Sequence, residues 1–158
     1  PLPEAQLDRF MFNLLIDYPT KKEEIEIVKN TTNINQNSVK VSISKENLIQ
    51  YQNIVKEVPV SDNVIEYAVN FVSETRPAYT SQKLIKDMID WGAGPRASTF
   101  LILAAKAKSI LSNKPTPDID DIISIIKPVL RHRIIPNFNA EAEGIKKDDI
   151  LDELLKSV

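Results

Sequence analysis

The residue best placed for chemistry is an arginine that follows two glycines and a proline. The segment Gly92–Ala97 reads Gly-Ala-Gly-Pro-Arg-Ala and formally fits a dinucleotide-binding fingerprint with alanine in the third place. Such a loop follows a strand, whereas the residues before Gly92 have a helical apolar pattern. We therefore interpret Gly92 as the end of one helix and Pro95 as the start of the next. Arg96 then lies in the first turn of a helix, where its charge opposes the helix dipole. Two interpretations stay open for it, a nearby anion or ordinary exposure to solvent.

A second arginine, Arg9, lies where the polar start of the chain meets an apolar run. The residues alone favour a surface ion pair with Asp8 or Glu4 over a functional contact. The cluster Arg131–Arg133 is also basic, but cations in the last turn of a helix complement its negative end, and no aromatic residues are interleaved. This cluster therefore does not predict a nucleic-acid site.

Composition excludes several classes of site. The chain of 158 residues has no Cys and one His, which removes disulfides, thiolate ligands and every metal site or catalytic pair that needs two imidazoles. Its three glycines never have the spacing of a Walker A loop. With 20 Lys and Arg against 22 Asp and Glu, the net charge of −2 gives no general attraction to a phosphate backbone. We expect no metal site and no nucleic-acid partner.

The ends of the chain and its hydropathy bear on location. No apolar run approaches the roughly 20 residues of a membrane span. The chain starts at Pro1, without an initiator Met or an export signal. We expect an excised piece of a longer cytoplasmic protein.

The first third of the chain has a mixed pattern. Phe10–Ile16 is apolar at nearly every position and predicts a buried strand, and Thr20 then caps a predicted helix that ends near Asn30. A single strand cannot satisfy its own backbone, so we infer that its sheet has been cut away. The polar stretch Thr31–Ser38 predicts a linker and a domain boundary.

Beyond that boundary the apolar spacing is helical throughout. The predicted fold class is mainly α, a small helical bundle preceded by one orphan strand and one helix. The helices expected in the bundle start at Ser44, Ser61, Leu84, Pro95 and Thr116, with a final one striped by Ile150, Leu151, Leu154 and Leu155.

Three segments, taken together and in this order, resemble the MoxR-type AAA+ ATPases. They are Pro1–Phe10, similar to the stretch after sensor 1; Trp91–Ala97, similar to the sensor 2 motif; and Val129–Ile134 with Asn137–Gly144, similar to the C-terminal signature. The Walker A, Walker B and sensor 1 segments of that family would precede Pro1. The resemblance implies that residues 1–35 end the αβα nucleotide-binding core and that residues 36–158 form the all-helical lid domain.

The resemblance also implies a function. Members of the family are ATPases that assemble into rings, usually hexamers, with nucleotide bound between subunits. By carry-over, Arg9 matches the arginine finger, which acts on the neighbouring subunit, and Arg96 with Gly94 and Pro95 matches the sensor 2 contact to an ATP phosphate. ATP and Mg²⁺ are then cofactors of the full-length protein, and the fragment alone is expected to bind none and to have no enzymatic activity. Chaperone-like remodelling of protein clients, von Willebrand factor A domain proteins among them, is the implied role.

Two other classes of function compete with this one. A helical protein-interaction module with no nucleotide role has the same apolar patterns. A helix-turn-helix DNA reader requires a basic face on the helix Pro95–Leu111, which offers only Arg96, Lys106 and Lys108.

Overall fold

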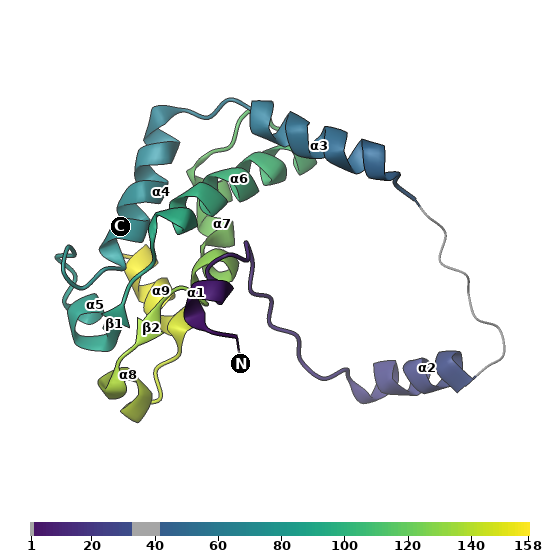
Figure 1. Ribbon diagram of the computed structural model, residues 1–158. Helices are drawn as coiled ribbons and strands as arrows, with labels where there is room; N and C mark the ends of the chain where they lie inside the picture. The colour runs from purple at the N-terminus through teal and green to yellow at the C-terminus, as the bar shows by residue number, and fades with distance from the viewer. Residues whose placement is uncertain (1, 33–41) are drawn as a thin grey trace. The chain divides into compact units, whose positions relative to one another are not determined.

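The computed structural model describes residues 2–32 and 42–158, and these residues are mainly helical (Figure 1). The prediction of a mainly α fold is confirmed. The elements are α1 (Glu4–Leu7), α2 (Lys21–Thr32), α3 (Lys45–Glu57), α4 (Asp62–Glu74), α5 (Lys83–Met88), β1 (Ile89–Trp91), α6 (Pro95–Leu111), α7 (Ile119–Leu130), β2 (Ile135–Pro136), α8 (Phe138–Ala142) and α9 (Lys147–Leu155). No helix within the described ranges combines the length and the hydropathy that a membrane crossing needs.

The chain divides into two compact units. The first takes in the residues up to Asn13 together with Asn53–Val158, and the second is Leu14–Gln52. Most of the predicted linker Thr31–Ser38 lies outside the described residues. The division of the chain into domains 1–35 and 36–158 therefore stays a prediction.

The core of the first unit lies among α4, α6 and α7, with α5, α8 and α9 packed beside them. Helix α6 brings small residues to this core, and Ala97 and Ala105 are fully buried. Small side chains allow neighbouring helices to approach α6 closely on both sides. The unit is thus built around α6, the helix that begins at Pro95.

Helix α7 shows how local sequence fixes the ends of an element. The Asp118 carboxylate accepts a hydrogen bond from the Asp121 backbone N–H at 3.0 Å, and the Asp121 carboxylate accepts one from the Asp118 N–H at 3.2 Å. This reciprocal capping box satisfies N–H groups that the first turn leaves free. Pro128 does not end the helix, which continues to Leu130.

A short antiparallel sheet joins the start of α6 to the end of α7. Strand β1 pairs with β2, with Ile89 opposite Pro136 and Trp91 opposite Ile135. The predicted helix end at Gly92 is wrong, because α5 stops at Met88 and a strand follows. The glycine has another reason: a Cβ at Gly92 would lie 2.4 Å from the carbonyl oxygen of Thr75.

The segment Phe10–Ile16, predicted as a buried strand whose sheet partners lie outside this chain, is not buried here, and its pairing in a sheet stays a prediction. These residues have no strand pairing in the described structure, and the side chain of Ile16 is 91% exposed. The N–H of Asn13 donates to the carbonyl oxygen of Pro128 at 2.8 Å, which links the segment to the end of α7. A strand needs a neighbour for its backbone groups, and an apolar run cannot supply one by itself. The predicted helix after Thr20 is confirmed as α2.

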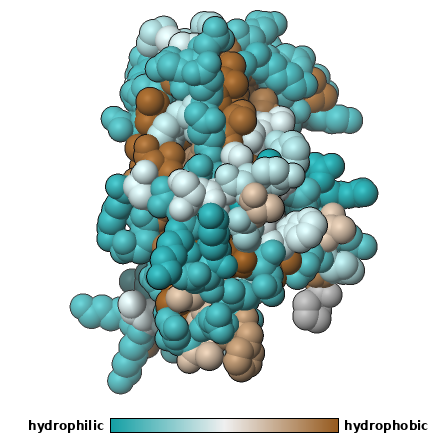
Figure 2. All heavy atoms as spheres, turned by 90° about the vertical axis from the view of Figure 1, so that its left-hand side faces the viewer, coloured by the Kyte–Doolittle hydropathy of each residue, from teal (hydrophilic) through white to brown (hydrophobic). Residues whose placement is uncertain are grey.

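Hydrophobic side chains remain at the surface in both units. Figure 2 shows a face that is mostly hydrophilic, with hydrophobic side chains visible between hydrophilic ones. None of the residues of α2 or α3 is buried, although both helices carry apolar side chains. In α2 these side chains include Ile25, Ile27 and Val28, all about half exposed.

Candidate functional site

Arg96 lies in the first turn of α6, as the sequence predicts. Gly94 is the residue that precedes the helix and Pro95 is its first residue. The guanidinium of Arg96 is about half exposed, and its Nη1 donates to Oδ2 of Asp8 at 2.6 Å. The anion beside Arg96 in this structure is therefore a carboxylate of the chain itself.

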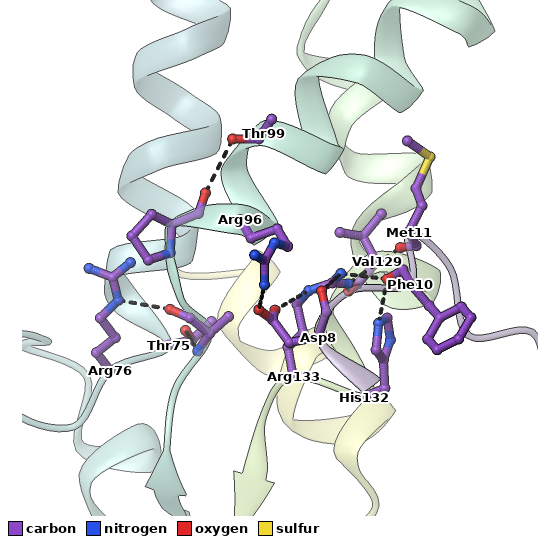
Figure 3. A network of polar contacts seen from close by, with 12 residues as sticks. Asp8, Phe10, Met11, Thr75, Arg76, Arg96, Thr99, Val129, His132 and Arg133 are labelled. Carbon is purple, nitrogen blue, oxygen red and sulfur yellow. Dashed lines mark hydrogen bonds and ion pairs between the residues drawn. The ribbon is translucent and has the colours of Figure 1, made fainter. Parts of the chain in front are cut away.

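Asp8 connects Arg96 to a third arginine. Its other carboxylate oxygen, Oδ1, accepts a hydrogen bond from Nε of Arg133 at 3.0 Å. The expected pairing of Asp8 with Arg9 is wrong, since both oxygens of Asp8 bind other arginines (Figure 3). One carboxylate thus ties the start of α6 to the turn after α7.

Arg133 is buried and binds the N-terminal segment. Its guanidinium donates to the carbonyl oxygens of Asp8 at 2.8 Å, Phe10 at 2.5 Å and Met11 at 3.3 Å, and also to that of Val129. The ring of Phe100 lies 5.0 Å from the guanidinium carbon, within range of a cation–π contact. Burial lowers the pKa of Arg133, and the hydrogen bond to Asp8 opposes this change. The side chain stays charged because an arginine does not lose its proton in proteins.

The two residues before Arg133 bind the same segment. His132 contacts the carbonyl oxygen of Phe10 through Nε2 at 3.0 Å, so this nitrogen carries the proton. Its other nitrogen, Nδ1, is buried without a hydrogen-bond partner among the described residues. Burial lowers the pKa of His132, which favours the neutral ring. Arg131 donates to the carbonyl oxygen of Asn13 at 3.3 Å and forms a two-point ion pair with Asp148.

Arg131–Arg133 lie at the end of α7, as the sequence suggested, but they do more than complement its negative end. Together they form a backbone clamp on residues 8–13, a name we keep for this contact set. The sequence analysis missed it because the two partners lie more than 115 positions apart. The sequence did contain a signal that Arg133 is buried. Arg133 stands next to Ile134 and four residues after Val129, and both of these belong to the apolar core.

Arg9 lies between the clamped residues but is itself exposed. Its backbone N–H donates to the carbonyl oxygen of Gln6 at 3.1 Å. Among the described residues, no salt bridge involves its side chain. The backbone at Arg9 is held, and its guanidinium is available to an outside acceptor.

A cavity of about 310 Å³ lies beside the Asp8–Arg133 pair. Polar and apolar groups share its wall, and none of the described residues gathers into a cluster of three or more metal-ligating side chains. The cavity is lined by Glu4, Ala5, Asp8, Trp91, Gly92, Gly94, His132, Arg133 and Ile135. The N-terminal segment, the loop before α6 and the backbone clamp all contribute residues to the cavity wall.

Comparison with known proteins identifies a lid domain in the second half of the chain. Residues 81–154, which include the start of α6 and the backbone clamp, match the family described as the AAA lid domain. Over its whole length the chain is 32% identical to Chaperone MoxR1 of Mycobacterium tuberculosis and 33% identical to the uncharacterized protein YeaC of Bacillus subtilis. It covers 42% and 47% of these two proteins.

A solved structure gives the same result. The chain superposes in full, with a TM-score of 0.91 and 35% identity, on 48% of the crystal structure of a "putative ATPase" from Cytophaga hutchinsonii. The chain thus spans less than half the length of the relatives it matches. Its three motifs, its helical fold and these relatives agree, and the chain belongs to the MoxR-type AAA+ family and carries an AAA lid domain.

Proposed function

We propose that this chain supplies the lid, the sensor 2 arginine and the arginine finger of an ATP-hydrolysing AAA+ protein. The observation that carries the proposal is the pair formed by Arg96 and Asp8 at the start of α6. A half-exposed arginine that holds a carboxylate at a helix N-terminus has the charge and the geometry to hold a phosphate there instead. Its partner Asp8 directly precedes Arg9, so the two arginines assigned to nucleotide chemistry lie on connected segments.

The chemistry assigned to Arg9 follows from charge development. In phosphoryl transfer, negative charge spreads over the γ-phosphate oxygens, and an arginine supplied by a neighbouring subunit stabilises it. Arg9 suits this role because its guanidinium is exposed while the backbone beside it is held. Arg96, with Gly94 and Pro95 before it, would hold a phosphate of ATP at the lid. ATP and Mg²⁺ would bind chiefly to the Walker A and Walker B segments, which the family resemblance places before Pro1 in the longer protein.

The wider role rests on the relatives. One of them is named a chaperone, which supports chaperone-like remodelling of protein clients by a ring, usually a hexamer in the resembled family. The von Willebrand factor A domain proteins as clients and the cytoplasm as location come from the sequence analysis and stay predictions. The competing function is a helical protein-interaction module with no nucleotide role, and ATP binding by the longer protein distinguishes the two.

The decisive experiment substitutes Arg9→Ala in the longer protein that contains this chain. We expect kcat for ATP hydrolysis to fall by about 10³-fold or more, with ATP affinity nearly unchanged, because the finger contact strengthens only in the transition state. The matched control is Lys22→Ala, which removes a cation of the same surface-exposed kind from α2.

Mixed rings extend the test. Arg9→Ala subunits combined with subunits that carry a defective phosphate-binding loop should regain part of the activity, since one intact site forms at their junction. Full turnover by Arg9→Ala alone in assembled rings would contradict the proposal. Absence of ATP binding by the longer protein would favour the interaction module.

A further inference from the structure

The donors of Arg133 are completely used. A guanidinium has five N–H bonds and no acceptor. In this structure Nε binds the Asp8 carboxylate, Nη1 binds the carbonyls of Met11 and Val129, and Nη2 binds the carbonyls of Asp8 and Phe10. Four of the five acceptors belong to the segment that contains Arg9. A side chain only 1% exposed thus directs nearly all of its hydrogen bonding to one short piece of backbone.

The contacts of Arg133 lie on both sides of Arg9. Nη2 alone holds the carbonyl before Arg9 and the carbonyl after it. The N–H groups of Arg9 and Phe10 are bound separately, to the carbonyls of Gln6 and Leu7 at 3.1 and 3.0 Å. The peptide groups around Arg9 are therefore fixed from two directions, and the freedom that remains is in the Arg9 side chain.

Arg133 is itself held in the lid. Its Nη1 bonds back to Val129 at the end of α7, and the ring of Phe100 in α6 lies against its guanidinium. A shift of the turn after α7 would therefore move the backbone that carries Arg9. Among the described residues, the segment pairs with no strand, so the contacts with Arg133 carry most of its anchoring here.

We infer that Arg133 is a positioning residue for Arg9, and that it transmits the position of the lid to the arginine finger through the backbone of residues 8–11. The inference rests on the proposed function of Arg9. Arg133 touches no reacting group in this scheme and acts through the backbone it holds. His132, which shares the Phe10 carbonyl, has a smaller part in the same role.

The first test needs only this chain. Arg133→Lys keeps the charge but has three donors for the five acceptors and lacks the planar fork. Amide exchange at Asn13, whose N–H is bound to Pro128, should rise by about tenfold or more relative to Ile126 in the core of α7. The matched control is Lys106→Gln, which removes a cation bonded to a distant carbonyl, that of Lys56. Unchanged exchange at Asn13 in Arg133→Lys would overturn the inference.

The second test measures ATP turnover in the longer protein. We expect Arg133→Lys to lower kcat by roughly 10- to 100-fold with KM for ATP within about twofold, the pattern of a displaced catalytic group. His132→Leu, a milder change, should lower kcat by about two- to fivefold. If the Arg133→Lys variant does not fold, the His132→Leu variant provides the test. Lys106→Gln should match the wild type.

A double-mutant cycle separates positioning from general damage. If Arg133 acts only through Arg9, the double variant Arg9→Ala with Arg133→Lys hydrolyses ATP no more slowly than Arg9→Ala alone. Multiplied losses would instead show that Arg133 acts by another route and would overturn the inference. Wild-type turnover in both Arg133→Lys and His132→Leu would also overturn it and leave the function of Arg9 intact. Full turnover in Arg9→Ala would remove the proposed function itself.

Discussion

At the scale of single residues, the close approach of another backbone segment explains why position 92 is a glycine. Gly92 has an ordinary negative φ and is needed because the backbone of Thr75 and Arg76 passes directly over it. The N–H of Ala93 continues this contact by donating to the hydroxyl of Thr75 at 3.0 Å. The loop that presents Arg96 is therefore fixed by packing against the end of α4.

A pair of glycines tests this point. In Gly92→Ala the new methyl group would lie 2.4 Å from the Thr75 oxygen, and we expect the free energy of unfolding to fall by about 1–3 kcal/mol or more. In Gly94→Ala no atom lies within 4 Å of the new methyl group, so the loss should stay below about 1 kcal/mol. Urea titrations of both variants give the two values. Equal losses would contradict this account of Gly92.

At the scale of elements, the helices differ in how much apolar surface they bury, and we expect their local stability to differ accordingly. Helix α7 buries Ile122, Ile126, Val129 and Leu130, whereas α2 buries nothing. Most helical stability in proteins comes from packing an apolar face.

Hydrogen exchange of this chain should reveal that difference. We expect backbone amides of α2 to exchange about 100-fold faster than those of α7, because opening α2 exposes no buried surface. The amides of α6 serve as the internal reference, since that helix is packed on two sides. Equal protection of α2 and α7 would contradict this expectation and would mean that α2 is packed against another part of the protein.

The elements also show what the sequence could predict. The helices α4, α6 and α7 follow from the apolar spacing, since a face that repeats every three to four residues is itself the packing signal. The apolar run Phe10–Ile16 predicts a strand but does not specify its partner, and among the described residues it has none. The strand β1 was missed because three residues carry too little periodicity to be told from the end of a helix.

The site divides in the same way. The place of Arg96 in the first turn of α6 follows from Gly94 and Pro95, which are neighbours in sequence. The sharing of Asp8 between Arg96 and Arg133 depends on contacts across 88 and 125 positions, and no local pattern contains that information. Such contacts depend on the tertiary packing of the bundle, so the three-dimensional structure is needed to identify them.

At the scale of the whole molecule, one histidine links the stability of the chain to mild acid. His132 is the single histidine of the chain, and burial lowers its pKa in the folded state. The nearby charge of Arg133 acts in the same direction, while the hydrogen bond to Phe10 opposes it. Below the ordinary histidine pKa of about 6.5, the unfolded chain therefore binds a proton more readily than the folded one.

The sign of the pH dependence follows. Stability from the neutral ring is fully present above the unfolded pKa and is lost as pH falls through the lowered folded value. We expect the urea midpoint of the wild type to decrease between pH 7.5 and 5.5, and that of His132→Leu to change less over the same range. Parallel curves for the two proteins would show that His132 does not titrate differently in the two states.

The backbone clamp also has a consequence for the order of folding. It joins residues 8–13 to residues 128–133, contacts that close a loop of about 120 residues and have high contact order. We expect the acceptor carbonyls to meet Arg133 only after α6 and α7 have packed, because Phe100 and Val129, which hold Arg133, come from those helices. We therefore expect the segment with Arg9 to be placed late, and under the proposed function a subunit whose bundle has not folded would present no ordered arginine to a neighbour. Closure of this long loop would then make correct folding of one subunit a condition for the proposed activity at the next.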